Sequence, residues 1–452
     1  MVADAINRSI SIRLARPELD AIRTAILDDQ TSTPELGMEF CKADQGDWRI
    51  YLCTTDRTDH CGISSVPAGI TLCRGDFRQG IAEWRDRVEA IVTLGNRIEI
   101  LIGPASDDGF EFVAIVHDAN GWKFADHAFL EEAPASRVWA GGSPPKTPNL
   151  PPERVARFTS SFGVEAWQRL RRSTAVVIGA GGTGSVTIPM LARAGVGRIV
   201  IVDSDHITPS NLERTHASFP EHVEAQTLKA ELARDHVRAI DPDIDVVAYA
   251  GRLPQPEIVA EIAKADVIVG CTDQHTSRLA VADMARRYLV PAIDCGGLIE
   301  GADGRVTGQI IQLVVFRPDD PCPICRGMID PVRVSQELVS PEERAAIKRA
   351  AGEGSVPPEA HEIPQIDTVG YITTVSGTLA AGYAIGWLTG RFDPPFERMQ
   401  MNLVADCLDV TNRPQKHDPQ CNCRSSRGSG DAGRALAPFA VPDHWQPARQ
   451  IL

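Results

Sequence analysis

The residues of this chain with the clearest chemical potential form a glycine-rich turn at 179–184, Gly-Ala-Gly-Gly-Thr-Gly. An apolar, β-branched run at 175–178 precedes the turn and predicts a buried strand, and a helical stretch at 185–194 follows it. Glycines let backbone N–H groups approach a phosphate at a helix N-terminus, where the helix dipole favours negative charge. The pattern predicts a nucleotide site that includes Gly179, Gly181, Gly182 and Gly184.

A second predicted strand, 198–202, ends on Asp203. A carboxylate at the end of the second strand can accept hydrogen bonds from ribose hydroxyls. Asp205 follows two residues later, and we include it among the predicted nucleotide contacts. The same glycine and aspartate pattern also fits NAD, so an NAD-dependent oxidoreductase remains an alternative.

The next loop carries a Ser-Asn-Leu-Glu-Arg stretch at 210–214. Together with the glycine turn, it closely resembles the nucleotide-site signature of the E1-like adenylyltransferases. That superfamily includes the ThiF and MoeB sulfur-carrier activators and the ubiquitin-activating enzymes. The resemblance covers residues 153–423 and implies that Asn211 and Arg214 hold ATP phosphates, as an amide donor and a guanidinium fork can do.

The resemblance assigns three further residues. Lys229, in the next predicted helix, would neutralise phosphate charge during displacement. Asp273, after a later core strand, would hold Mg²⁺, and it is also placed to cap the helix that follows. Arg157, in the segment before the first core strand, matches an arginine that reaches the ATP site of a partner subunit. The chain is therefore expected to form a homodimer.

Two close cysteine pairs lie far apart in the sequence. They are Cys322, Cys325, Cys421 and Cys423. Such pairs suit a tetrahedral structural Zn²⁺, although incidental thiols are the alternative. The second pair is C-x-C, with a tighter spacing, so Cys407 or His417 is an alternative ligand to one of its members.

A catalytic thiol is missing from the expected place. Ubiquitin-activating enzymes carry a cysteine in the crossover segment, which maps onto residues 330–372, and this segment has none. We expect Cys271 and Cys295, at strand ends, to be packed thiols. Thioester formation is therefore not predicted, whereas adenylation needs no thiol.

Bulk properties limit the functional class. The chain has 452 residues and a formal net charge of -14, which argues against broad binding to nucleic acids or anionic membranes. No apolar run is long enough to span a bilayer, and the first residues lack the apolar core of a signal peptide. Eleven cysteines without an export signal predict a reducing, cytoplasmic location.

Alternating strands and helices predict an α/β fold with a doubly wound, Rossmann-like and mostly parallel sheet. The apolar strand at 306–316 is expected in a mixed or antiparallel part, which the zinc would staple. A smaller α+β domain precedes it, with a helix at 17–28 and strands at 49–52, 97–102 and 110–117. We expect these segments: an N-terminal domain of unknown role at 1–140, a proline-rich linker at 141–152, the adenylation domain at 153–423 with a mobile crossover at about 330–372, and a flexible linker and C-terminal tail at 424–452.

The predicted activity is ATP-dependent adenylation of a C-terminal carboxylate, giving an acyl-adenylate and pyrophosphate. The resemblance implies a ubiquitin-like or sulfur-carrier substrate with a slim tail ending in glycine. The fused N-terminal domain suggests a bacterial ubiquitin-like conjugation system, with a separate E2-like partner. Besides the oxidoreductase, a non-catalytic E1-like scaffold is the other alternative.

Overall fold

The chain divides into two compact units in the computed structural model. One unit comprises Met1–Leu150 with Arg287–Leu289 and Ser425–Leu436, and the other holds the remaining residues from Pro151 to the C-terminus. The structure describes residues 10–14, 36–42, 48–54, 68–72, 77–92, 97–104, 110–118, 121–125, 127–130, 137–138, 150–352, 367–404, 407–411, 416–430 and 438–452.

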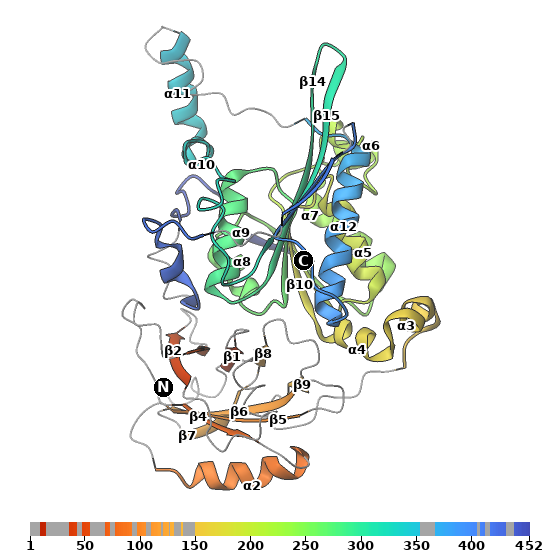
Figure 1. The fold of residues 1–452 in the computed structure, drawn as a ribbon. Coiled ribbons are helices and arrows are strands. Elements are labelled where there is room, and N and C mark those ends of the chain that lie inside the picture. The colour runs from red at the N-terminus through yellow and green to blue at the C-terminus, as the bar shows by residue number, and fades with distance from the viewer. Residues whose placement is uncertain are drawn as a thin grey trace. The chain divides into compact units, whose positions relative to one another are not determined.

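The described residues of the N-terminal unit form two sheets (Figure 1). The first has the order β2 (Leu36–Lys42), β3 (Trp48–Thr54), β1 (Ile10–Leu14) and β8 (His127–Leu130). The second has the order β4 (Ala68–Leu72), β5 (Arg97–Pro104), β6 (Phe110–Asp118) and β7 (Gly121–Phe124), with β9 (Arg137–Val138) also paired to β6. Helix α2 (Phe77–Glu89) packs Trp84 against Leu101 and Val113 of the second sheet. The α+β character and three predicted strands are confirmed, whereas the helix expected at 17–28 lies outside the described residues.

A nine-stranded sheet forms the core of the second unit. Its five central strands are all parallel to their central neighbours. In spatial order they are β14 (Ala292–Ala302), β13 (Val267–Gly270), β10 (Thr174–Ile178), β11 (Arg198–Val202) and β12 (Asp245–Ala250). Because helices cover both faces, β10, β11 and β13 are almost wholly buried apolar runs. The strand order reverses between β10 and β13, which creates a crevice at the carboxyl ends of these strands.

Antiparallel strands extend this sheet at both edges. Strands β15 (Arg305–Phe316), β16 (Arg398–Asn402) and β17 (Cys407–Thr411) follow β14 in a meander. This confirms the expected mixed region and the antiparallel placement of the apolar strand at 306–316. At the other edge, β18 (Arg449–Ile451) pairs antiparallel with β12.

Helices α5 (Gly184–Ala194), α7 (Lys229–Ile240) and α12 (Gly370–Thr389) lie on one face of the sheet, and α8 (Pro256–Ile262) and α9 (His275–Arg287) lie on the other (Figure 1). Glycine in α12 permits close packing on α5, because a Cβ at Gly377 would lie 2.5 Å from the carbonyl oxygen of Thr183. Thr187 of α5 also donates a hydrogen bond to the Gly377 carbonyl, at 3.2 Å. Helix α5, which begins at the glycine turn, is therefore fixed by its packing against α12.

Short helices complete the unit: η3 (Glu153–Val155), α3 (Ala156–Phe162), α4 (Val164–Arg172), η4 (Pro209–Asn211), α6 (Pro220–Glu224), α10 (Pro331–Leu338), α11 (Pro341–Gly352) and η6 (Asn422–Ser426). Within the described residues, each helix is too short or too polar to traverse a lipid bilayer.

Two segments differ from the flexible connections that their composition predicts. The described part of the crossover forms α10 and α11, and α10 is capped by Asp330, whose carboxylate accepts from the Val332 N–H at 2.9 Å. The segment after residue 424 contains the end of η6 and a Ser426–Ser429 turn, and residues 449–451 form β18. Local hydrogen bonds and strand pairing thus order residues whose Ser, Gly and Pro content suggested a free linker.

Candidate active site

Steric constraints shape the glycine turn between β10 and α5. Gly179 has φ +97°, and a Cβ there would lie 2.8 Å from the carbonyl oxygen of Cys271. A Cβ at Gly184 would lie only 1.9 Å from the carbonyl oxygen of Gly179. Gly181, in contrast, has open space where its Cβ would be, with nothing within 4 Å. The turn is therefore tightly packed behind and open in front, which leaves room for a phosphate at the N-terminus of α5.

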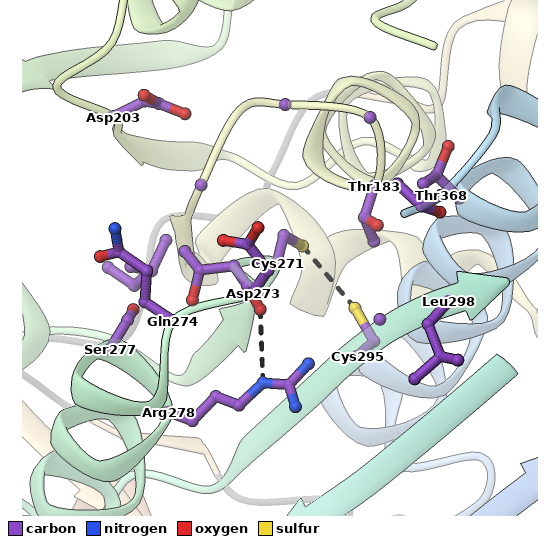
Figure 2. Close-up of a pocket in the computed structure, with 18 of the residues that line it drawn as sticks. Thr183, Asp203, Cys271, Asp273, Gln274, Ser277, Arg278, Cys295, Leu298 and Thr368 are labelled. Carbon is purple, nitrogen blue, oxygen red and sulfur yellow. Dashed lines mark hydrogen bonds between the residues drawn. The ribbon is translucent and has the colours of Figure 1, made fainter. Parts of the chain in front are cut away.

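A cavity of about 510 Å³ opens in front of this turn, at the reversal of strand order. Figure 2 shows that its walls come from separate segments, with Asp203 and Asp273 following different strands. The predicted site residues that line it are Gly179, Gly181, Gly182, Asp203, Asp205, Asn211, Arg214, Lys229 and Asp273. Gly184 begins α5 behind the cavity, and Arg157 does not line it.

Backbone donors fix Asp203 at the end of β11. Its carboxylate accepts hydrogen bonds from the Ala180 N–H at 2.7 Å and the Asp205 N–H at 2.9 Å. Burial raises the pKa of Asp203, and the charge of Lys229 offsets part of that rise. Asp203 thus ties the glycine turn to the end of the second strand.

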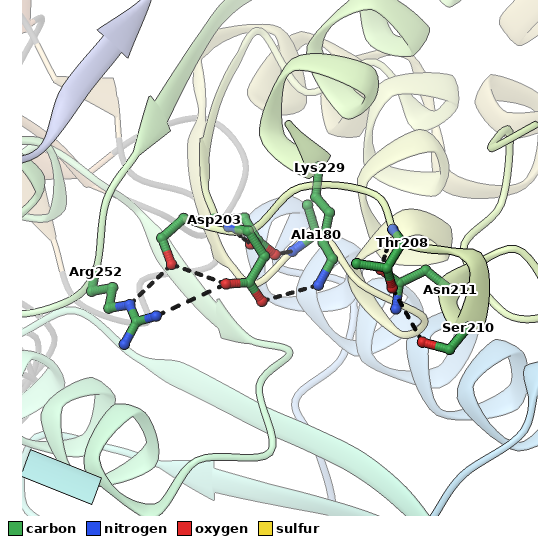
Figure 3. A network of polar contacts seen from close by, with 9 residues as sticks. Ala180, Asp203, Thr208, Ser210, Asn211, Lys229 and Arg252 are labelled. Carbon is green, nitrogen blue, oxygen red and sulfur yellow. Dashed lines mark hydrogen bonds and ion pairs between the residues drawn. The ribbon is translucent and has the colours of Figure 1, made fainter. Parts of the chain in front are cut away.

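Two cations from separate segments, Lys229 and Arg252, pair with the carboxylate of Asp205 (Figure 3). Lys229 places Nζ 3.0 Å from one carboxylate oxygen, and Arg252 lies 3.9 Å from the other. Although burial opposes it, the charge of Lys229 lowers the pKa of Asp205. Lys229 is therefore held in the cavity by an anion that a nucleotide phosphate could replace.

Loop contacts fix the 210–214 segment beside Lys229. The side-chain oxygen of the buried Asn211 accepts a hydrogen bond from the Thr208 N–H at 3.1 Å. Arg214 donates to the carbonyl of Ser210 at 2.7 Å. Glu213 accepts from the N–H of Gly370 at 2.7 Å, which joins the loop to the start of α12. These bonds place an amide and a guanidinium at one side of the cavity before any ligand binds.

Asp273 lies at the cavity rim between β13 and α9. It does not supply the helix cap, because Glu337 of α10 accepts from the His275 and Thr276 N–H groups at 3.1 and 2.8 Å. Among the described residues, no hydrogen-bond or ion-pair partner of the Asp273 carboxylate is found. An exposed carboxylate without a partner is suited to a hard cation.

Arg157 lies outside the cavity of its own chain. It is exposed on α3, and no described side chain pairs with it. Its neighbour Arg154 instead forms an ion pair with Asp241, which also binds Arg171 at 3.0 Å. The two arginines of this segment therefore have different environments, and Arg157 is the one left accessible.

Several cavity residues were not predicted from the sequence. Arg252 lies two residues beyond the end of β12, and its position after a parallel strand was an available signal. Arg278 lies 3.4 Å from the buried Asp294, whose pKa burial raises to about 6. Trp445 also lines the cavity, although it lies in the C-terminal tail. Cys271 and Cys295, which we expected to be packed thiols, both line it with sulfur atoms 3.7 Å apart (Figure 2).

The two cysteine pairs meet in one cluster. The four sulfur atoms of Cys322, Cys325, Cys421 and Cys423 all lie within 4.8 Å of one another. Three of the contacts measure 3.6, 3.6 and 3.8 Å. Four thiolates around zinc at about 2.3 Å would have sulfur–sulfur separations of about 3.8 Å, so this donor set fits a tetrahedral zinc ion.

The alternative ligands take other places. His417 lies beside the cluster, with Nδ1 3.4 Å from the sulfur of Cys423 and Nε2 3.3 Å from the carbonyl of Asp319. Cys407 is in β17, and its side chain is outside the described residues. Hydrogen bonding with Cys423 and burial raise the pKa of the Cys322 thiol to about 12. A bound cation would favour the thiolate form of Cys322.

With this geometry established, comparison with known proteins identifies the family. Residues 154–425 match the ThiF family, which is more than half of the chain. The chain belongs to the ThiF family. The match spans the glycine turn, the cavity and the cysteine cluster, and it ends before the C-terminal segment with Trp445 and β18.

Curated relatives in this family are activating enzymes and adenylyltransferases. The SAMP-activating enzyme E1 of Haloferax volcanii is 30% identical over 261 residues, which cover 57% of this chain and 83% of that protein. The adenylyltransferase and sulfurtransferase UBA4 of Saccharomyces cerevisiae is 34% identical over 163 residues, 36% of this chain and 35% of that protein. The chain thus spans about a third of the yeast protein. The sulfur carrier protein ThiS adenylyltransferase of Bacillus subtilis is 27% identical, and the match covers 65% of that protein.

Solved structures are more distant. The structure of E. coli MccB with ATP is 18% identical, with a TM-score of 0.44, and the match covers 61% of this chain and 76% of that one.

Proposed function

We propose that this ThiF-family chain is an ATP-dependent adenylyltransferase that activates the C-terminal carboxylate of a ubiquitin-like or sulfur-carrier protein. The observation that carries the proposal is the cavity at the carboxyl ends of β10, β11 and β13, which combines an open glycine turn with Lys229, Arg214 and an exposed Asp273. The named relatives support this over an NAD-dependent oxidoreductase and over a non-catalytic scaffold.

The reaction places few chemical demands on the protein. The attacking carboxylate is already ionised at neutral pH, since its pKa is about 3.5, so no general base is required. A bond forms between a carboxylate oxygen and the α-phosphorus, the bond from that phosphorus to the bridging oxygen breaks, and pyrophosphate leaves. Catalysis then consists of positioning and of neutralising negative charge.

The cavity residues divide these tasks. Gly179, Gly181 and Gly182 would bring backbone N–H groups to the phosphates, while Asp203 and Asp205 would contact the ribose side. The cations and the amide would hold the phosphate oxygens: Asn211, Arg214 and Lys229. Lys229 already pairs with Asp205 at 3.0 Å, so phosphate binding would exchange one anionic partner for another.

Asp273 would hold the Mg²⁺ that accompanies ATP. Its carboxylate is exposed at the cavity rim and, among the described residues, it has no competing partner. The bound ion would supply positive charge to the phosphate oxygens. The matched variant Asp273→Asn keeps the shape of this side chain and removes its charge.

The four-cysteine cluster would hold a structural Zn²⁺. The cysteines join the turn after β15 to η6, segments almost a hundred residues apart in the chain. A closed site with four protein ligands stabilises the fold and leaves no open position for chemistry. Reduced cysteines in this cluster are consistent with a cytoplasmic location.

Transfer beyond the adenylate would use a separate thiol. The crossover segment has no cysteine in the sequence, so an E2-like partner or another acceptor would receive the activated carboxylate. The substrate would present a slim, glycine-ending tail to the cavity.

ATP–pyrophosphate exchange tests this function. We expect exchange with a small β-grasp protein that ends in glycine, and no exchange when its terminal glycine is removed. Asp273→Asn should lower exchange at least a hundredfold while the thermal unfolding temperature stays unchanged. Wild-type protein that binds ATP but supports no exchange with any such carrier would contradict the proposal.

A further inference from the structure

The C-terminal segment 438–452 contributes to the nucleotide cavity although it lies beyond the family match. We propose that Trp445, together with Arg252, forms the base-side wall of the cavity and contacts the purine of the bound nucleotide. This inference rests on the proposed ATP-dependent function, and it adds a specificity-determining residue that the family match does not contain.

Several contacts fix the segment against the sheet. Strand β18 pairs with β12, so that Ala250 lies opposite Arg449. A Cβ at Gly251 would lie 2.8 Å from the Cβ of Ala448, so glycine is needed where the two segments approach. Arg234 of α7 also donates a hydrogen bond to the carbonyl of Leu452. The tail is therefore part of the folded unit at this edge.

A buried amide connects the tail to the loop that carries Arg252. The side-chain oxygen of Gln255 accepts from the Arg252 N–H at 2.7 Å, and its Nε2 donates to the carbonyl of Gln446 at 2.7 Å. Gln255 is only 3% exposed, so both bonds are shielded from water. The residue next to Trp445 and the backbone of Arg252 are thus held by one side chain.

The arrangement of the cavity identifies which end of a nucleotide would meet this wall. The glycine turn and Lys229 form the phosphate end, and Asp203 at the end of β11 marks the ribose. Arg252 and Lys229 lie apart in the polar network, and each is near a different oxygen of the Asp205 carboxylate (Figure 3). A nucleotide that runs from the turn past Asp203 therefore places its base next to Arg252 and the residues that support it.

Trp445 and Arg252 together make a surface suited to a purine. The Arg252 guanidinium lies over the indole ring, 5.6 Å from its centroid, and its Nε donates to Ser204 at 2.9 Å. Leu253, on the same loop, adds an apolar side chain to the cavity lining. Aromatic and guanidinium planes stack on the π-faces of bases, so this wall would contact the base and not the phosphates.

A probe with a base and a probe without one distinguish a contact to the base from a general effect of the substitution on the cavity. Isothermal titration with Mg²⁺ would compare a non-hydrolysable ATP analogue with inorganic triphosphate, which has no base. We expect Trp445→Ala to weaken the ATP analogue about tenfold and to leave triphosphate affinity unchanged. Trp445→Phe, which keeps an aromatic face, should weaken it less than threefold. Gln450→Ala, an exposed position on β18, is the matched control and should behave as wild type.

A double variant tests whether the two side chains act together. If Arg252 and Trp445 form one wall, Trp445→Ala should cost much less in an Arg252→Ala background than in the wild type. Equal affinities of the wild type and Trp445→Ala for the ATP analogue, or equal losses for both probes, would overturn this inference alone. Absence of ATP binding by the wild type would overturn the proposed function and this inference with it.

Discussion

Alanine at Gly181 provides a direct test of the phosphate end of the cavity. No heavy atom lies within 4 Å of the Cβ that alanine would add, and the backbone there is not in the left-handed region. The substitution should therefore change the free energy of unfolding by less than about 0.5 kcal/mol. The new methyl group would instead occupy the open space in front of the turn.

The expected loss is in nucleotide affinity. A methyl group at Gly181 would keep a phosphate from the backbone N–H groups, removing one or two charge-assisted hydrogen bonds. Each is worth about 1.5 to 3 kcal/mol, so affinity should fall about tenfold if one weak bond is lost and about 10⁴-fold if two strong bonds are lost. Isothermal titration with a non-hydrolysable ATP analogue measures this, and urea denaturation measures the unfolding free energy.

Alanine at Gly184, three residues later in the same turn, is the matched control. Its Cβ would lie 1.9 Å from the Gly179 carbonyl oxygen, so the backbone must move and the protein should lose about 3 kcal/mol of stability. The reasoning would be refuted if Gly181→Ala bound the analogue within twofold of wild type, or if Gly184→Ala were as stable as Gly181→Ala.

Three further predictions concern other residues. Burial raises the pKa of Asp294 from 3.8 to about 6, so the stability that its protonated form contributes is present below pH 4 and is lost as the pH rises through 6. In the Asp294→Asn protein, the free energy of unfolding, measured by urea denaturation, should lose up to about 3 kcal/mol of this pH dependence. If the free energies of unfolding of the two proteins changed in parallel with pH, the prediction would be contradicted. Elemental analysis should find about one zinc per chain, and chelation should lower the unfolding temperature by about 5 °C or more with little change in ATP affinity; zinc-free native protein would exclude the metal site. If Arg157 completes the site of a partner subunit, a mixture of inactive Arg157→Ala and Asp273→Ala proteins should recover about a quarter of wild-type exchange, because about half of the dimers are hybrids with one intact site. A mixture that stays inactive after verified subunit exchange would rule this out.

The sequence was sufficient to predict site residues that directly follow the central strands. The apolar run at 175–178 and the run that ends before Asp203 are buried on both faces, so each is typical of a parallel strand. Once two neighbouring strands are parallel, the residues after them must lie at one edge of the sheet. The glycine turn and Asp203 could therefore be placed together without knowing any side-chain contact.

The parts that sequence reasoning missed depend on contacts between distant segments. Strand β18 has three residues, Arg-Gln-Ile, with no alternation that would distinguish it from a tail. Its position depends on pairing with β12, about two hundred residues earlier, and on the Gln255 amide. The pairing of Arg278 with Asp294 likewise joins a helix to a strand, and neither residue has a local signal. The position of β18 and the pairing of Arg278 with Asp294 depend on long-range packing, which local propensities do not encode.

Catalysis and metal binding are expected to be separable. The residues of the proposed nucleotide site follow the central parallel strands, whereas the cysteine cluster joins the turn after β15 to η6, and Trp445 precedes β18, which pairs with β12. Among the described residues, no hydrogen bond, ion pair or ring contact joins the cluster ligand Cys322 to the wall residue Trp445. Their energetic effects should be additive, as expected for independent sites. Cys322→Ser would then lower stability equally in wild-type and Trp445→Ala proteins, and Trp445→Ala would weaken ATP binding equally with or without the cluster intact.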